Sequence, residues 1–213
     1  MAGLIITVAQ QKGGAGKTTV AAHLAIAYML DGKSVAILDV DPQGSLGQWF
    51  ERREERLGED ATGLVFRTAS GWGAKREAKG LARSHDVVIV DTPPKSDVEL
   101  KPALKAASLV VVPVQPTPMD LWATEPTLAM IDAEGTRSLL VLNRVVARAL
   151  ITGEIAEAVG KLGHRVAKAS FGNRVAYAAS IGDGGTVLET DPVSLAAEEA
   201  RAVAREVARR AAG

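Results

Sequence analysis

The stretch QQKGGAGKTT, residues 10–19, decides how the N-terminal part of the chain folds and points to a ligand. It follows the apolar run of residues 4–9 and leads into an apolar-rich segment, residues 18–30. A glycine-rich turn between a strand and a helix directs backbone N–H groups and the helix N-terminus at phosphate oxygens. The usual pattern, G-x-x-x-x-G-K-[ST], is met at its end but fails at Gln11. We therefore expect a phosphate-binding loop that carries one additional lysine, Lys12.

This loop contains the groups that a nucleoside triphosphate and its cation require. Lys17 can reach the β- and γ-phosphates, and the Thr18 hydroxyl can ligate Mg²⁺. The small residues leave the backbone N–H groups of the turn accessible, and the predicted binding loop comprises Lys12, Gly13, Gly14, Ala15, Gly16, Lys17, Thr18 and Thr19. A glycine-rich turn without a ligand is the alternative, and the lysine–threonine pair at the correct offset argues against it.

The composition of the 213 residues is typical of a folded chain with a sizeable core, and we expect one domain spanning residues 1–213. Because the chain has no cysteine, disulfides, thiolate metal sites and iron–sulfur clusters are excluded. Lys and Arg number 25 and Asp and Glu number 25, so net charge argues neither for nor against a polyanionic partner. No secretory signal is visible and the apolar runs are too short to span a bilayer, so we expect a soluble, cytoplasmic protein.

Short β-branched runs alternate with longer amphipathic stretches along the chain. The expected strands are Leu4–Ala9, Ser34–Asp39, Leu64–Arg67, Asp86–Asp91, Leu109–Pro113 and Ser138–Asn143. The expected helices are Thr18–Leu30, Ser45–Leu57, Ala74–Arg83, Asp97–Ala107, Met119–Asp132, Glu154–Leu162 and Val193–Ala212, and the glycine pair in GDGGTV, residues 184–185, is expected to form a turn. Nearly continuous apolar strands alternating with helices predict an α/β fold, a mostly parallel twisted sheet with helices on both faces.

Two of the expected strands end in aspartates. Asp39 ends one strand and Asp41 follows it, and Asp91 ends another. In a parallel sheet these strand ends lie on the same edge as the phosphate loop, which is where ligands bind. A hard cation beside a triphosphate needs carboxylates, often acting through bound water. Aspartates also end strands and cap turns without any ligand, and the lysine loop on the same edge favours the functional interpretation.

Together these motifs resemble those of a known family. The pattern K-G-G-x-x-K-T, residues 12–18, is similar to the deviant Walker A motif of the ParA/MinD/nitrogenase-iron-protein class of P-loop NTPases. DVDPQG at residues 39–44 looks like the second motif of that class, and VDTPP at residues 90–94 looks like its Walker B motif. PVQPTPMDLWA at residues 113–123 and ETDPVSLAAEEARAVAREV at residues 189–207 are similar to small ParA proteins, the partitioning ATPases without an N-terminal DNA-binding domain. The resemblance covers nearly the whole chain and is weakest across about residues 51–81.

The resemblance implies a slow, Mg²⁺-dependent ATPase that acts as a switch. Lys12 matches the signature lysine, which reaches across a nucleotide-sandwich dimer to the phosphates bound by the partner. Lys12, Lys17 and Asp41 are the predicted catalytic residues, and Asp41 matches the aspartate that orients the attacking water. Because one required lysine would come from a second subunit, ATP would favour a homodimer and hydrolysis would remove that preference.

The same resemblance implies ligands for the metal and contacts for the base. Thr18 and Asp91 match the Mg²⁺ ligand and the Walker B acid, and Asp39 matches a supporting acid near the metal. Asn143 falls where the family often contacts adenine, and the loop at Asp191–Pro192 matches the segment that closes over the base. Asn143 can equally be a turn residue at the end of a strand.

Basic residues are concentrated in the second half of the chain. The candidates for contacts to DNA phosphates are Lys161, Arg165, Lys168, Arg174, Arg201 and Arg205. A solvated helix face that pairs with Glu198 and Glu199 is an equally good account of the C-terminal arginines. The resemblance favours non-specific binding to nucleoid DNA, with a ParB-like or other cargo adaptor that stimulates hydrolysis. The cargo would be a plasmid, a chromosome region or a protein assembly.

Two other functions remain on the same scaffold. A MinD-like membrane switch would end in a helix with bulky apolar residues on one face, and none follows Leu195. We therefore expect no membrane partner. A small-molecule ligase or kinase is the second alternative, because a fold does not determine a function. His23, His85 and His164 stand singly in the sequence, and no further catalytic cluster supports that alternative.

Overall fold

Within the described residues, six strands form one sheet in the order β3-β2-β4-β1-β5-β6, and each neighbouring pair is parallel. The strands are β1 (Leu4–Val8), β2 (Val35–Asp39), β3 (Val65–Thr68), β4 (Val87–Asp91), β5 (Leu109–Val114) and β6 (Ser138–Leu142). The structure is a computed structural model that describes residues 2–94, 97–146, 154 and 157–213. The parallel sheet with its covering helices confirms the predicted α/β fold.

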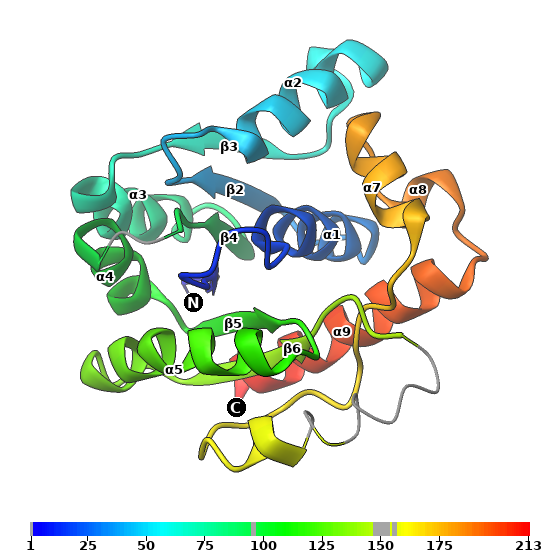
Figure 1. The fold of residues 1–213 in the computed structure, drawn as a ribbon. Coiled ribbons are helices and arrows are strands. Elements are labelled where there is room, and N and C mark those ends of the chain that lie inside the picture. Colours follow the sequence, from blue (N-terminus) through cyan, green and yellow to red (C-terminus); the bar gives the residue numbers. More distant parts are fainter. Residues whose placement is uncertain (1, 95–96, 147–153, 155–156) are drawn as a thin grey trace.

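Helices lie on both faces of this sheet (Figure 1). They are α1 (Lys17–Leu30), α2 (Ser45–Leu57), α3 (Ala74–Leu81), α4 (Asp97–Ala106), α5 (Pro118–Ala133), α7 (Val175–Gly182), α8 (Val187–Thr190) and α9 (Leu195–Ala212). Successive strand residues alternate between the two faces: Ile37 packs in the core that includes α1 and α9, and Leu38 packs with α3 and α4. Because both faces are covered, the strands are apolar at nearly every position. None of the helices in the described part of the chain is long and apolar enough to cross a membrane.

The observed elements lie within two residues of the expected ones wherever the sequence carries a long apolar pattern. The sequence did not predict α7 or α8. These helices have eight and four residues, so their apolar pattern is too short to stand out beside the neighbouring glycines. The glycine pair in GDGGTV was expected to form a turn, and it lies in residues 183–186, which connect the two helices. Of the expected helix Glu154–Leu162, residues 155–156 lie outside the described part and residues 157–160 are helical.

The turn between α7 and α8 lies directly against α2. Gly184 has a φ of +66°, and a Cβ added to it would lie 2.4 Å from the backbone nitrogen of Arg53. Gly185 accepts a hydrogen bond on its carbonyl oxygen from Trp49 Nε1 at 2.9 Å. A Cβ added to Gly185 would lie 3.1 Å from the guanidinium nitrogens of Arg56. The glycine pair therefore permits an approach to the α2 backbone that a larger residue would prevent.

The substitution Gly184→Ala is expected to lower the free energy of unfolding by about 3 kcal/mol, because left-handed strain adds to overpacking against α2. Gly32→Ala is the matched control, since Gly32 also has a positive φ, +77°, but an added Cβ meets nothing within 4 Å. The expected loss for the control is about 1 kcal/mol. Urea unfolding followed by circular dichroism measures both losses, and equal losses would contradict the importance of the close approach.

Candidate nucleotide-binding site

The loop between β1 and α1 contains two glycines in left-handed conformations. The φ angles are +75° at Gly14 and +93° at Gly16. A Cβ added to Gly16 would also lie 2.3 Å from Nδ2 of Asn143, so this position has no room for a side chain. Asn143 follows β6, and its Nδ2 donates a hydrogen bond to the carbonyl oxygen of Ala15 at 2.8 Å. An amide from another strand end therefore fixes the shape of the loop.

Lys17 and Thr18 begin α1 beside the end of β4. The Thr18 hydroxyl donates a hydrogen bond of 2.6 Å to Asp91 Oδ2. Lys17 is buried, and burial lowers the pKa of its ammonium, although the carboxylates of Asp91 and Asp41 oppose that shift. Burial also raises the pKa of Asp91 to about 7, against the hydrogen bond from Thr18. The sheet edge thus holds one cation close to two acids in a poorly solvated place, which suits a site built for phosphates and a metal.

The donor groups at this edge suit Mg²⁺ better than they suit a metal ion whose ligands all come from the protein. No cluster of three or more His, Asp or Glu side chains is placed to bind a metal within the described residues. Mg²⁺ commonly takes only one or two protein ligands and completes its octahedron with phosphate oxygens and water. The Thr18 hydroxyl, oriented by Asp91, is the group that would face such an ion.

Asp39 and Asp41 occupy the loop between β2 and α2. Asp39 is buried, and its two carboxylate oxygens accept backbone N–H bonds of 3.0 Å from Asp41 and Gly47. Burial nevertheless raises the pKa of Asp39, because those hydrogen bonds offset only part of the desolvation. Asp41 is half-buried and accepts a 2.9 Å bond from the backbone N–H of Gln43. Asp39 therefore holds Asp41 in place, and the role of Asp39 near a metal stays a prediction.

Lys12 lies on the rim of the phosphate loop, and its partner comes from α5. Its Nζ is 2.7 Å from Oδ2 of Asp120, which is almost fully buried in the first turn of that helix, while the Lys12 side chain is 34% exposed. The Thr117 hydroxyl caps α5 by accepting the backbone N–H of Asp120 at 3.1 Å. The stretch that contains Asp120 stands out in the sequence, but its contact with Lys12 does not, since nothing local reveals a pairing so distant in sequence.

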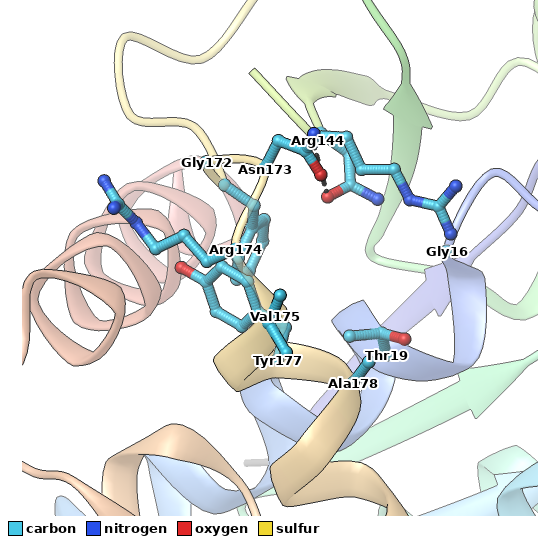
Figure 2. A pocket seen from close by; sticks show the side chains of 11 residues that line it. Gly16, Thr19, Arg144, Gly172, Asn173, Arg174, Val175, Tyr177 and Ala178 are labelled. Atoms are coloured by element: carbon cyan, nitrogen blue, oxygen red, sulfur yellow. Dashed lines mark hydrogen bonds between the residues drawn. The ribbon is translucent and has the colours of Figure 1, made fainter. Parts of the chain in front are cut away.

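A cavity of about 280 Å³ adjoins the loop on the side of α7. Figure 2 shows Thr19, Arg144, Val175, Tyr177 and Ala178 around it, with Arg144 at the top of the view and Thr19 and Ala178 lower down. Its full lining is Gly16, Thr19, Asn143, Arg144, Phe171, Gly172, Asn173, Arg174, Val175, Tyr177 and Ala178. This polar and aromatic mixture beside a phosphate loop is suited to a nucleoside.

The structure separates the two residues that were predicted to contact the base. Asn143 lines the cavity, but its amide groups already bind Ala15 and, through Oδ1, the backbone N–H of Arg144 at 2.9 Å. Pro192 does not line the cavity, and its carbonyl oxygen accepts a hydrogen bond of 2.8 Å from Arg201. The roles of both residues toward a base stay predictions.

His23, which stands singly in the sequence, lies beneath this cavity against two of its lining residues. Its Nδ1 is 2.7 Å from the carbonyl oxygen of Thr19, and its Nε2 accepts the backbone N–H of Val187 at 3.3 Å. Its ring meets Phe171 and Tyr177 edge-on. Burial lowers the pKa of His23 to about 4, so the neutral ring joins α1 to the start of α8.

The six basic residues predicted to contact DNA fall into two groups. Three have partners: Arg174 binds Glu199 through two hydrogen bonds, of 2.6 and 3.0 Å, Lys161 pairs with Glu157 at 2.9 Å, and Arg201 binds Pro192. The others, Arg165, Lys168 and Arg205, are exposed and have no side-chain ion pair with any described residue.

A basic hollow brings some of these residues together. It has a volume of about 480 Å³ and is lined by Leu139, Arg165, Val166, Lys168, Glu206, Arg209 and Arg210. Its one acid, Glu206, accepts backbone N–H bonds of 3.0 Å from Lys168 and Ala169. The buried Nε of Arg210 has no hydrogen-bond partner among the described residues. The hollow therefore presents four cations with little internal neutralisation.

Comparison with known proteins identifies the family of the chain. Residues 6–168 match the CobQ/CobB/MinD/ParA nucleotide binding domain, and the chain belongs to that family of P-loop ATPases. The maintenance of carboxysome distribution protein A of Halothiobacillus neapolitanus is 28% identical over 190 residues, covering 86% of each chain. The protein of that name from Gloeobacter kilaueensis is 37% identical over 164 residues, covering 76% of this chain and 71% of its own. The structure of the septum site-determining protein MinD of Pyrococcus horikoshii, complexed with Mg-ADP, has a TM-score of 0.79 at 21% identity, covering 96% and 95% of the two chains.

A pH dependence of stability follows from His23. Its folded pKa of about 4 lies below the ordinary value of 6.5, so the unfolded chain binds the proton first as the pH falls. The contribution of the neutral ring is fully present above pH 6.5 and is lost as the pH falls toward 4. At pH 5 the loss is about 2 kcal/mol.

The variant His23→Gln does not titrate, so its stability should fall by about 2 kcal/mol less than that of the parent between pH 7.5 and pH 5. Urea unfolding at the two pH values measures the difference. His85→Gln, which alters a histidine away from the cavity, is the control and should follow the parent. Parallel losses for the parent and His23→Gln would contradict the assignment.

Proposed function

We propose that the protein is an ATP-dependent switch that binds ATP with Mg²⁺, dimerises in that state and hydrolyses ATP slowly. The observation that carries the proposal is the convergence at one sheet edge of buried Lys17, the Thr18–Asp91 hydrogen bond and the Asp41 loop. Lys17 would bind the β- and γ-phosphates, and the cavity beside Thr19 would receive the nucleoside. The Mg-ADP complex of the structurally similar MinD supports the same ligands.

Hydrolysis in such a site depends on positioning and charge neutralisation at the γ-phosphoryl group. Mg²⁺, when bound beside Thr18, would supply part of that neutralisation. Asp41 borders a hollow of about 630 Å³ that opens beside the loop between β2 and α2, so water can reach the Asp41 carboxylate. Asp41 would orient that water, and Asp39 would keep Asp41 in place through its bond to the Asp41 N–H.

The position of Lys12 supports the proposal that the protein dimerises. Its ammonium is held by Asp120 on the rim of the loop and not inside the phosphate site of its own chain. Met119 and Trp122 stand beside Asp120 on α5 and are 69% and 66% exposed, and such apolar surface suits an interface. In the dimer Lys12 would exchange Asp120 for the phosphates bound by the second chain. ATP would then favour the dimer, because the nucleotide binds that state better.

DNA would bind to the basic hollow, and the bound switch would position a cargo through an adaptor protein. Arg165, Lys168, Arg209 and Arg210 can contact phosphates without first breaking an ion pair to any residue that the structure describes. A dimer carries two copies of the hollow, so dimerisation would raise the affinity by multivalency. The names of the two relatives concern the distribution of carboxysomes, and we therefore favour a protein assembly as the cargo over a plasmid or chromosome region.

Lys12→Ala should abolish ATP-dependent dimerisation and reduce hydrolysis by at least about a hundredfold, while ATP still binds the monomer. Sedimentation and a nucleotide-binding titration measure the two properties separately. Lys17→Ala should lose nucleotide binding itself, and Lys33→Ala removes an exposed lysine as the control. A Lys12→Ala variant that dimerises and hydrolyses ATP like the parent would exclude the proposed role of the lysine.

The DNA proposal is tested in an Asp41→Ala background, which should hold ATP without hydrolysing it. Adding Arg165→Ala, Lys168→Ala and Arg209→Ala together should weaken DNA binding by at least about tenfold at low salt and make its salt dependence less steep. Lys161→Ala is the control, because Glu157 already neutralises that lysine. Unchanged binding in the triple variant would move the DNA surface elsewhere, and a parent dimer that ignores DNA at low salt would refute DNA binding.

A further inference from the structure

Arg53 is a fully buried cation on α2, far along the helix from the Asp41 loop. It is 1% exposed, and its Nη2 and Nη1 lie 2.8 and 3.0 Å from the two carboxylate oxygens of Glu189. Its Nε donates to the carbonyl oxygen of Thr62 at 2.9 Å, and its guanidinium lies 5.8 Å from the centroid of the Trp49 ring. A forked, two-bond contact of this kind fixes the angle between its partners as well as their distance.

Glu189 belongs to α8 and organises the start of that helix. One of its oxygens accepts the backbone N–H of Thr186 at 3.2 Å, which completes a capping box. Beside this pair Trp49 binds the carbonyl oxygen of Gly185, and Gly184 touches the backbone of α2. Figure 1 shows α7 and α8 alongside α2 and α1. The whole contact is between α2 and the segment from residue 183 to residue 189.

The two sides of this contact lead to different parts of the nucleotide site. α2 begins at Ser45, immediately after the Asp41 loop, and its Gly47 N–H binds Asp39. On the other side, α7 supplies the cavity residues Tyr177 and Ala178. The cavity of about 280 Å³ beside Thr19 is called the base cavity here. Since α2 is one continuous helix, its contact with the α7–α8 turn fixes the Asp41 loop relative to the wall of that cavity.

Fold stability alone does not explain an ion pair at this position. Replacing a buried ion pair by well-packed apolar residues is often neutral or stabilising, because the two charges must be desolvated. The contact does, however, give a stiff connection of defined geometry between two elements. An enzyme gains rate when binding energy from a distant part of the substrate is used to position the reacting groups.

We infer that Arg53, with Glu189, is a positioning residue that couples occupation of the base cavity to the placement of Asp41. Binding of the nucleoside against α7 sets the α7–α8 turn, the turn sets α2, and α2 sets the loop that orients water. Binding of the base therefore raises the turnover number for ATP hydrolysis as well as the affinity for ATP. The inference rests on the proposed ATP hydrolysis and adds the route by which the base acts on it.

The test compares ATP with inorganic tripolyphosphate, which has the same phosphate chain and no nucleoside. The parent should hydrolyse ATP with a kcat at least about tenfold above that for tripolyphosphate. The double variant Arg53→Met with Glu189→Met removes both charges of the pair together. Its kcat for ATP should fall to near the tripolyphosphate value, while its kcat for tripolyphosphate and its affinity for ATP change by less than about threefold.

Lys105→Met with Glu134→Met is the control, since it removes a more exposed ion pair, with an N–O distance of 3.9 Å, between α4 and the residue that follows α5. It should keep the parental ratio of kcat values. A folded Arg53/Glu189 variant that keeps that ratio overturns the inference and leaves the proposed function intact. A parent that hydrolyses neither compound refutes the proposed function instead.

Hydrogen exchange on the unaltered chain gives a second test that needs no folded variant. ADP should slow amide exchange in residues 45–57 and 183–186, because ADP fills the base cavity. Pyrophosphate has no nucleoside and should not slow exchange there. Exchange in α4 is the internal control and should respond equally to the two ligands. Equal protection of α2 by ADP and pyrophosphate would overturn the coupling.

Discussion

The hydrogen bond from Thr18 to Asp91 joins the phosphate loop to the centre of the sheet, and the other parts of the site are arranged around it. β4 lies between β2 and β1, so the acid at its end is enclosed by neighbours on both sides. A carboxyl group there is poorly solvated, and its pKa rises to about 7. Lys17 is placed beside it and shares the same desolvation. The site therefore holds charges that phosphates and Mg²⁺ would balance better than water does.

Around this centre, each loop at the sheet edge is fixed by a contact from another element. Asn143 holds the phosphate loop, Asp39 holds the Asp41 loop, and Asp120 holds Lys12. These contacts keep the functional side chains near their positions without a ligand, which lowers the cost of ordering them when one binds. Lys12 differs from the others, because its partner is an acid and not a backbone group. In the proposed dimer its ammonium would exchange this anion for a phosphate.

The predicted strands and most helices were correct because each carries a long apolar pattern and lies between two covered faces. The phosphate loop and the acids at the strand ends could also be predicted, since a parallel sheet brings the carboxyl ends of its strands to one edge. By contrast, α7 and α8 were missed, because short helices formed by packing against α1 and α2 leave little periodicity. The list of DNA contacts mixed cations that pair with a described residue and cations that do not. Glu199 illustrates why: it was considered a partner for its helical neighbours but binds Arg174.

By itself, the sequence determined the fold class, the phosphate loop, the additional lysine and the family to which the chain belongs, because these depend on residues close together in the chain. Only the tertiary structure decided that Asp120 binds Lys12, that His23 lies under the base cavity and that Arg53 binds Glu189. Each of those contacts joins elements that are distant in sequence. Their geometry follows from how helices pack on a shared sheet, and a linear pattern contains no direct record of that packing.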